Sequence, residues 1–201
     1  MTDFDEAAAA WDTPEREERA RALAAAIREH APPDPGSRLI EIGAGTGLLG
    51  LQFAREVESV MLTDPSVGML EVARRKIEAA GLGNVSTAVW DAPGNPPPGS
   101  PYGLAISLLA LHHVEDTGQT FRSIHGLLGP DGHIALLDLD AEDGSFHDDD
   151  IEGIHPQGFD RREIERLAKS LGFTDVATRL VYEIEREGRA YPLFLLTGRR
   201  S

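Results

Sequence analysis

A glycine-rich segment at residues 39–50, LIEIGAGTGLLG, has the residue types and spacing of a cofactor-binding loop. Glycine lets a tight turn adopt backbone conformations that other residues avoid, and it lets a ligand approach the main chain closely. In one interpretation Gly45, Gly47 and Gly50 form the G-x-G-x-x-G pattern of a dinucleotide site, with a pyrophosphate at the N-terminus of the following helix. Asp64 would then bind the ribose hydroxyls, because it lies 19 residues after Gly45.

Glu41 favours a different ligand. It lies at the end of an expected strand and precedes a tighter G-x-G-x-G pattern, formed by Gly43, Gly45 and Gly47. A carboxylate at this place repels a pyrophosphate but attracts a ligand that carries an ammonium group. The segment therefore favours a nucleoside bearing an amino acid over a dinucleotide. The alternative without a ligand is a strand glutamate beside a structural turn.

Two adjacent histidines, His112 and His113, follow the apolar run at residues 103–111. A histidine close to a reacting group can remove a proton from an oxygen or nitrogen nucleophile. Both are therefore candidate catalytic residues, and His113 is preferred because it directly precedes an expected helix start. The alternative is that the pair only packs and forms hydrogen bonds at that helix start.

An acidic segment at residues 138–155 has seven carboxylates between Asp138 and Asp150, with His147 and His155 close by. Carboxylates and imidazoles are suitable metal ligands, so a metal site is one interpretation. However, three consecutive aspartates cannot all face one ion, and the segment shows no ligand spacing. We therefore predict no metal, and instead a solvated loop that acts as a lid over the mouth of the site.

The overall composition narrows the possible classes of function. With 201 residues, 41% of them hydrophobic, the chain is long enough to bury the core of one domain. It has no cysteine, which excludes disulfides, zinc–thiolate sites and thiol catalysis. Its net charge of −15 repels phosphate backbones and anionic lipids. We therefore expect neither nucleic acid nor membrane among its partners.

The expected location is the cytoplasm. The N-terminal sequence MTDFDEAAAAWD is acidic, whereas a secretory signal begins with basic residues. No apolar run approaches the length of a transmembrane helix.

Elements that could position these residues alternate along the chain. Short apolar runs rich in β-branched residues predict strands at 38–43, 60–64, 85–91, 103–110 and 133–140. Helical periodicity predicts helices at 13–29, 48–57, 66–81 and 118–129. Thr13 can cap the first helix and Gly81 ends the third. Such alternation predicts a parallel sheet that is covered by helices on both faces.

The C-terminal third has a different order of expected elements, with one helix followed by two successive strands. A helix is expected at 159–172, with Asp160 as its N-cap. Two β-rich runs at 177–186 and 189–199 then flank the short turn Glu187–Gly188. Runs separated by so short a turn pair as an antiparallel hairpin. The fold class predicted is therefore α/β, with a mostly parallel sheet that ends in an antiparallel hairpin.

Taken together, these motifs resemble the class I S-adenosylmethionine-dependent methyltransferases, in particular the small-molecule, type 11-like members, over nearly the whole chain. EIGAGTG is similar to the family's first motif, where the glycine loop lies against the methionine part of the cofactor. Asp64 matches the acid that binds both ribose hydroxyls. Asp91 matches the residue that accepts a hydrogen bond from the adenine amino group, with Ala92 beside it. One departure is Gly103, where many relatives have an aspartate.

The resemblance also implies a role for the N-terminal segment, FDEAAAAWD. In the family an aromatic residue of this region often closes over the bound cofactor, and Trp11 is the candidate, with Phe4 behind it. The alternative is that both rings only anchor the first helix to the core.

We therefore expect a Rossmann-like, seven-stranded mixed sheet in a single domain, 1–201, with an N-terminal helical cap at 1–30 and an α/β core at 37–201. The implied activity is methyl transfer from S-adenosylmethionine to a small-molecule acceptor, which leaves S-adenosylhomocysteine, in a monomer or homodimer. His113 and His112 are the candidate catalytic residues, and the predicted cofactor-binding residues are Glu41, Gly43, Ala44, Gly45, Asp64, Pro65, Met69, Asp91, Ala92, Ser107, Leu108 and Trp11.

Three alternatives remain at this level. A non-catalytic module that binds S-adenosylmethionine would carry the same donor motifs. An NAD-dependent oxidoreductase would use GTGLLG, but the sequence has no recognisable hydride-transfer signature such as Tyr-x-x-x-Lys. A methyltransferase that acts on a protein is also compatible, whereas the acidity argues against RNA as the substrate.

Overall fold

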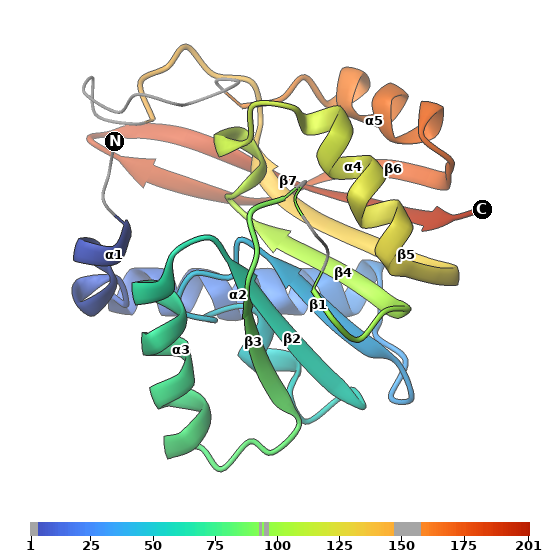
Figure 1. The fold of residues 1–201 in the computed structure, drawn as a ribbon. Helices are drawn as coiled ribbons and strands as arrows, with labels where there is room; N and C mark the ends of the chain where they lie inside the picture. Colours follow the sequence, from blue (N-terminus) through green and yellow to red (C-terminus); the bar gives the residue numbers. More distant parts are fainter. Residues whose placement is uncertain (1–3, 93, 95–96, 147–157) are drawn as a thin grey trace.

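The structure is a computed structural model, and it describes residues 4–92, 94, 97–146 and 158–201. A seven-stranded sheet with the order β3-β2-β1-β4-β5-β7-β6 forms its centre (Figure 1). The strands are β1 (Arg38–Ile42), β2 (Ser59–Asp64), β3 (Val85–Val89), β4 (Tyr102–Leu108), β5 (Leu128–Leu139), β6 (Phe173–Arg186) and β7 (Arg189–Arg200). The helices are α1 (Phe4–Ala7), α2 (Pro14–His30), α3 (Val67–Ala79), α4 (Thr117–Leu127) and α5 (Arg161–Ser170).

Strands β1 to β5 are parallel to one another, and β7 pairs antiparallel with both β5 and β6. The hairpin turn has positive φ at Glu187 (52°) and Gly188 (76°), as a two-residue turn of the I′ type requires. The predicted fold class is thus confirmed, including the C-terminal hairpin.

Helices cover both faces of this sheet, and each face has its own core (Figure 1). One core contains Leu23 and Ile27 of α2 together with Ala73 of α3. The other contains Phe121 of α4 and Ile164 of α5. The central strands β1 and β4 are therefore buried on both sides, as their continuous apolar sequences indicate, whereas the edge strands β3 and β6 are mostly not buried.

The helix starts follow local sequence signals. Thr13 accepts a hydrogen bond from the Arg16 amide, and Asp160 accepts from the amides of Arg162 and Glu163. Both caps were predicted, and each satisfies backbone donors that have no partner within the helix.

Three predicted elements differ from the structure by four residues or more, and one of them is β6, which begins at Phe173 instead of Ala177. The helix expected at 48–57 is only a 3₁₀ turn, η2 (Gly50–Phe53), in which the amides of Gln52 and Ala54 donate to carbonyls three residues earlier. Strand β5 begins five residues before the expected start at His133. Its first residue, Leu128, pairs with Tyr102, and an irregularity separates this pair from the regular register that begins at His133.

Candidate functional site

A cavity of about 230 Å³ opens at the carboxyl ends of β1, β2 and β4. Strands β1 and β4 are neighbours in the sheet although they are not consecutive in the chain, so the crevice lies where the strand order reverses. Ligands of open α/β sheets bind at such a point. The predicted site residues that line this cavity are Trp11, Glu41, Gly43, Ala44, Gly45, Asp64, Pro65, Met69, Asp91, Ala92, Leu108 and His113.

The glycine loop between β1 and η2 forms the floor of the cavity. Its glycines adopt left-handed conformations, with φ of 66° at Gly43, 53° at Gly45 and 79° at Gly47. A Cβ at Gly43 would lie 2.3 Å from the Cβ of Ala110, and one at Gly47 would lie 2.8 Å from a methyl group of Leu62. Both the conformation and the close packing therefore require glycine at Gly43 and Gly47.

Glu41 is buried beneath this loop, with 1% of its surface exposed. Its Oε2 accepts a hydrogen bond of 2.9 Å from the Gly50 amide, and burial raises the pKa of Glu41 to about 8. A Cβ at Gly50 would lie only 2.3 Å from that oxygen. The last glycine of the G-x-G-x-x-G pattern is therefore explained by the Glu41 side chain, without a pyrophosphate.

Asp64 lies at the end of β2, beside the glycine loop. Its two carboxylate oxygens accept hydrogen bonds from the amides of Gly45 (2.7 Å) and Ser66 (2.8 Å). Burial raises the pKa of Asp64 despite these bonds. Each oxygen has a second lone pair, so the carboxylate can still accept hydrogen bonds from a ligand in the cavity.

Beyond the end of β3, Asp91 is exposed at the edge of the cavity, and Ala92 is partly buried beside it. The preceding Trp90 is buried, lines the cavity and donates through Nε1 to the Gly94 carbonyl at 3.2 Å. Sequence reasoning did not select Trp90. Its position directly before Asp91, at the end of an expected strand, is the signal that could have identified it.

The N-terminal segment crosses the cavity and is attached at two points. Asp5 accepts from Ser66 Oγ (2.5 Å) and from the Gly68 amide (2.7 Å) at the start of α3. Asp12 accepts from Thr46 Oγ1 in the glycine loop and from Lys76 Nζ of α3.

Next to these attachments, the rings of Phe4 and Trp11 line the cavity and meet edge to face at 5.8 Å. The Arg16 guanidinium stacks on the Trp11 ring at 4.0 Å and donates to the Trp11 carbonyl. Trp11 is thus held over the glycine loop, in the place that the sequence analysis expected for a covering aromatic residue.

Helix α2 adds two arginines to the cavity wall, Arg16 and Arg19, which sequence reasoning missed. Arg19 forms no ion pair or hydrogen bond with any residue that the structure describes, and its Nε is buried without a partner. Burial, followed by the neighbouring Arg16, lowers the pKa of Arg19. The only sequence signal was their three-residue spacing on one helix face, which is common on solvated helices.

The two histidines have different environments. His113 lines the cavity, with its ring 5.8 Å from that of Phe4. His112 points away from the cavity: it is 1% exposed, and its Nδ1 lies 2.6 Å from Asp138 Oδ1. His112 is not among the residues that line the cavity, so of the predicted pair only His113 lies where its ring could contact a ligand there.

Ser107 is the other predicted site residue that is absent from the cavity lining. Its hydroxyl is fully buried and donates to the Ile42 carbonyl at 2.8 Å, across the pair of strands β1 and β4. It does not line the cavity, whereas the next residue, Leu108, does. The Ser107 hydroxyl is thus used within the sheet, one residue before the point where the cavity begins.

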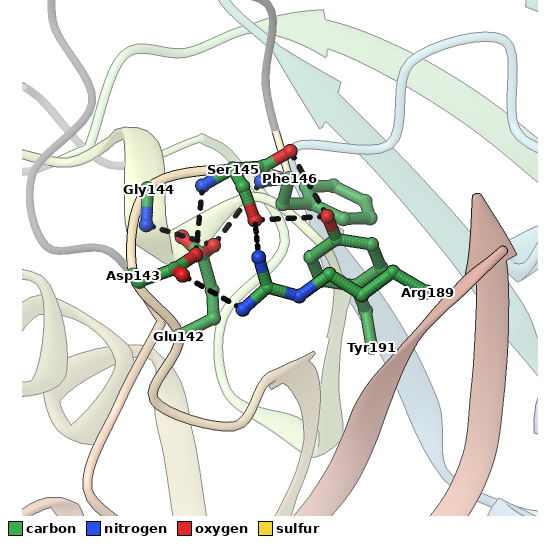
Figure 2. Close-up of polar contacts among 7 residues, drawn as sticks. All are labelled: Glu142, Asp143, Gly144, Ser145, Phe146, Arg189 and Tyr191. Atoms are coloured by element: carbon green, nitrogen blue, oxygen red, sulfur yellow. Dashed lines mark hydrogen bonds and ion pairs between the residues drawn. The ribbon is translucent and has the colours of Figure 1, made fainter. Parts of the chain in front are cut away.

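The described start of the acidic segment is attached to the hairpin. Arg189 donates to Asp143 Oδ2 at 2.8 Å and to Ser145 Oγ at 2.6 Å. Figure 2 shows both contacts. The Tyr191 hydroxyl lies 2.9 Å from Ser145 Oγ, and its ring packs against Phe146 (Figure 2). The hydrogen bond from Arg189 lowers the pKa of Asp143 to about 2. This carboxylate is therefore paired rather than simply solvated.

The remainder of that segment, residues 147–157, lies outside the described residues. The predicted lid, and the interpretation of His147 and His155, therefore stay predictions. In the part of the chain that the structure describes, no three histidine or carboxylate side chains are grouped so that they could hold a metal ion. Within those same residues, no helix is long and apolar enough to cross a membrane.

Comparison with known proteins places this geometry in a family. Residues 16–178 match the methyltransferase domain family. A ubiquinone/menaquinone biosynthesis C-methyltransferase of Teredinibacter turnerae is 33% identical over 116 residues, which are 56% of this chain and 47% of that protein. The chain thus spans about half the length of the curated relatives that it matches.

Two solved structures have the same fold at 18% identity. The YcgJ protein of Bacillus subtilis superposes with a TM-score of 0.72 over 90% of this chain and 98% of its own. Phosphoethanolamine N-methyltransferase 2 of Haemonchus contortus, solved with S-adenosyl-L-methionine, superposes with a TM-score of 0.74 over 90% of this chain and 52% of its own. Because the family match covers well over half of its length, the chain belongs to the methyltransferase domain family, within the class I S-adenosylmethionine-dependent methyltransferases.

Proposed function

We propose that this protein transfers a methyl group from S-adenosylmethionine to a small-molecule acceptor. The observation that carries the proposal is the distribution of charge around one cavity. Asp64 and Asp91 lie on its β2–β3 side, Arg16 and Arg19 enter from α2, and the glycine loop lies at its floor. Carboxylates suit hydroxyl and amino donors, and a guanidinium suits a carboxylate. This polarity matches a nucleoside that carries an amino acid.

In the proposed complex, each end of the donor has its own partners. Asp64 accepts from the ribose hydroxyls, and Asp91 accepts from the adenine amino group. Glu41 attracts the ammonium group, and the glycine loop lets the methionine part approach the backbone. Arg19 binds the carboxylate. Apolar contacts to the base and ribose come from Pro65, Met69, Trp90 and Ala92, and Trp11 covers the site.

The bound donor supplies a methyl group already activated on a sulfonium, so the protein has to align the acceptor and exclude water. Leu108, Leu109 and Ala110 form the wall after β4 and shield the reacting atoms. His113 lies in the same wall, where a ring nitrogen can take the proton that an oxygen or nitrogen acceptor loses.

The names of similar proteins support the proposed class of methyl acceptor, a small molecule. The curated relatives are C-methyltransferases of ubiquinone and menaquinone biosynthesis, and the Haemonchus structure is an N-methyltransferase. These names cover small acceptors with different reacting atoms, so they support a small molecule and not a particular atom. Small-molecule C-methylation is the version that the sequence relatives support. A protein acceptor remains the alternative enzyme function.

Calorimetric titration of the protein with S-adenosylmethionine, S-adenosylhomocysteine and NAD tests the donor. We expect binding of the two sulfur nucleosides in the micromolar range, typical of enzyme ligands, and no binding of NAD. Binding of NAD alone would reject the proposal. A subsequent screen of acceptors for S-adenosylhomocysteine release separates an enzyme from a non-catalytic binding module.

Binding of S-adenosylhomocysteine should strengthen as the pH rises from about 6 to about 8. Burial raises the pKa of Glu41 to about 8, so the side chain is mostly protonated at neutral pH in the free protein. The ammonium group favours the carboxylate, and binding therefore releases a proton. Linkage gives roughly a tenfold gain in affinity per pH unit below the pKa and a plateau above it. Calorimetry in buffers of different ionisation enthalpy measures both the affinity and the number of protons released on binding.

Glu41→Gln is the matched variant, because the amide oxygen can still accept from Gly50. It should bind more weakly at pH 8, without the rise in affinity. The pH dependence of folding stability also has a definite sign. Between pH 4.5 and about 8, the folded wild-type protein keeps a proton on Glu41 that the unfolded chain has lost. Wild-type stability therefore falls across this window, and the variant lacks that fall. Equal pH dependence in both proteins would contradict the assignment.

Arg19→Gln should weaken binding of S-adenosylhomocysteine by roughly 10- to 100-fold, because a charge-assisted hydrogen bond contributes about 1.5–3 kcal/mol. Binding of 5′-methylthioadenosine, which has no carboxylate, should stay unchanged. Arg21→Gln on the same helix is the control, since Arg21 is exposed and pairs with Glu18. An equal loss for both ligands would mean that Arg19 only supports the shape of the cavity.

A further inference from the structure

Next to the cavity, Asp138 and His112 form a fully buried pair that the proposed reaction does not use. Asp138 is the penultimate residue of β5 and is 0% exposed. Its Oδ1 lies 2.6 Å from Nδ1 of His112 and accepts from the Leu139 amide at 2.8 Å. Its Oδ2 accepts from the Leu111 amide at 3.0 Å. One carboxylate thus holds two consecutive residues of η3 (Leu111–His113), the 3₁₀ turn after β4.

This turn has little local stability of its own. It is only three residues long, and no side chain caps its start. The preceding Leu109 has a positive φ of 53°, a conformation that costs a non-glycine residue about 1 kcal/mol or more. An element that is short, uncapped and strained needs contacts from elsewhere to keep one geometry. Asp138 supplies two of them from the neighbouring strand.

The same turn shapes the transfer side of the cavity. His113 lines the cavity, and its ring lies 4.2 Å from the ring of His112. On its other side, the ring of Phe4 approaches edge-on at 5.8 Å. Ala110 packs against the first glycine of the loop, Gly43. A shift of the turn would therefore move His113 relative to the donor.

We propose that Asp138 and His112 are positioning residues, which set the place of His113 at the methyl-transfer site through the turn that they hold. This inference rests on the proposed function, because it assumes that His113 lies at a methyl-transfer site. The contacts that hold the turn are present in the protein without any ligand. A buried carboxylate is costly unless it is fully hydrogen-bonded, and a hydrophobic pair can fill the same volume at no loss of stability. Here the hydrogen bonds of the pair instead fix the orientation of the His112 ring and the position of the turn, which packing alone would leave less defined.

The test compares two replacements of His112. Asparagine keeps a donor close to the place of Nδ1 but leaves space unfilled, whereas leucine fills the volume but has no donor. The readout is the ring signal of His113 in ¹H–¹⁵N spectra of histidine-labelled protein, assigned with His113→Gln. Phe4→Leu provides the reference for a His113 ring without its aromatic neighbour.

If the hydrogen bond positions the turn, His112→Leu and Asp138→Asn shift the His113 signal toward its value in Phe4→Leu. His112→Asn then keeps the signal closer to the wild-type position than His112→Leu does, since both variants lose the neighbouring His112 ring. The opposite order, with leucine retaining the wild-type signal and asparagine losing it, would show that the pair acts only by packing and would overturn the proposal. His125→Gln, on α4 and outside the cavity lining, is the control for replacing a histidine.

The choice of readouts separates this inference from the proposed function. The His113 signal is read in the free protein, so it decides the positioning role even if S-adenosylhomocysteine does not bind. If Asp138→Asn does not fold, the asparagine and leucine variants of His112 still decide the question. For an acceptor found by screening, the positioning role predicts at least a tenfold lower kcat in His112→Leu with little change in the KM for S-adenosylmethionine; an unchanged kcat would contradict it.

Discussion

Replacement of Asp64 with alanine is expected to weaken binding of S-adenosylhomocysteine by about 100-fold or more. The proposed contacts are two ribose hydroxyls that donate to a carboxylate, and each such bond contributes about 1.5–3 kcal/mol. Asp64 is only 8% exposed, so in the variant water cannot easily replace the lost carboxylate as the hydrogen-bond acceptor for the ribose. Its amide partners, Gly45 and Ser66, already hold the carboxylate in position, so the bonds cost the protein little further order. Calorimetry gives the affinity.

Asp160→Ala is the matched control for this variant. Asp160 also accepts from two backbone amides, at the start of α5, but it does not line the cavity. Both variants remove two hydrogen bonds to backbone amides, so thermal unfolding should show a loss of stability in each. Only the loss of affinity should be specific to Asp64→Ala. An Asp64 variant that folds and binds S-adenosylhomocysteine as tightly as the wild type would refute the ribose assignment.

The second large effect is expected for Gly43→Ala. The new Cβ would lie 2.3 Å from that of Ala110, and the backbone has a φ of 66°. Strain at positive φ costs about 1 kcal/mol, and an added methyl group in a packed site costs about 1–3 kcal/mol. The free energy of unfolding should therefore fall by about 3 kcal/mol. For a chain of this size, the melting temperature should fall by roughly 10 °C.

The chain has a control that separates these two costs. Gly81 has nearly the same φ, 62°, but nothing lies within 4 Å of the position of its Cβ. Gly81→Ala should therefore show only the cost of the backbone, about 1 kcal/mol. Ala110→Gly in the Gly43→Ala background should recover the steric part. If both glycine variants are equally destabilised, contact with Ala110 is not the reason for glycine at residue 43.

The third glycine of the dinucleotide-like pattern shows how one sequence can satisfy two motifs. Gly50 matches G-x-G-x-x-G, but in the structure it gives space to the side chain of Glu41. The pattern alone could not separate these reasons, since both require a residue without a Cβ. The distinction depends on a contact between residues nine positions apart.

The order of elements, the sheet with its C-terminal hairpin and half of the cavity lining could be predicted from the sequence, because these features have local causes. Periodicity identifies strands and helices, and a two-residue turn specifies a hairpin. Side chains at the carboxyl ends of parallel strands also meet at one edge of the sheet. Glu41 and Asp64 could therefore be assigned to one site before their positions were known.

Only the tertiary structure decided which neighbouring side chains face the cavity. The sequence treats His112 and His113 alike, but a carboxylate from β5 holds the first and leaves the second in the cavity wall. Arg16 and Arg19 resemble arginines of any solvated helix until α2 is placed against the site. Local sequence patterns predict on which face of a helix or strand a residue lies. Whether that face meets water, core or cavity depends on contacts with segments that are distant in the chain.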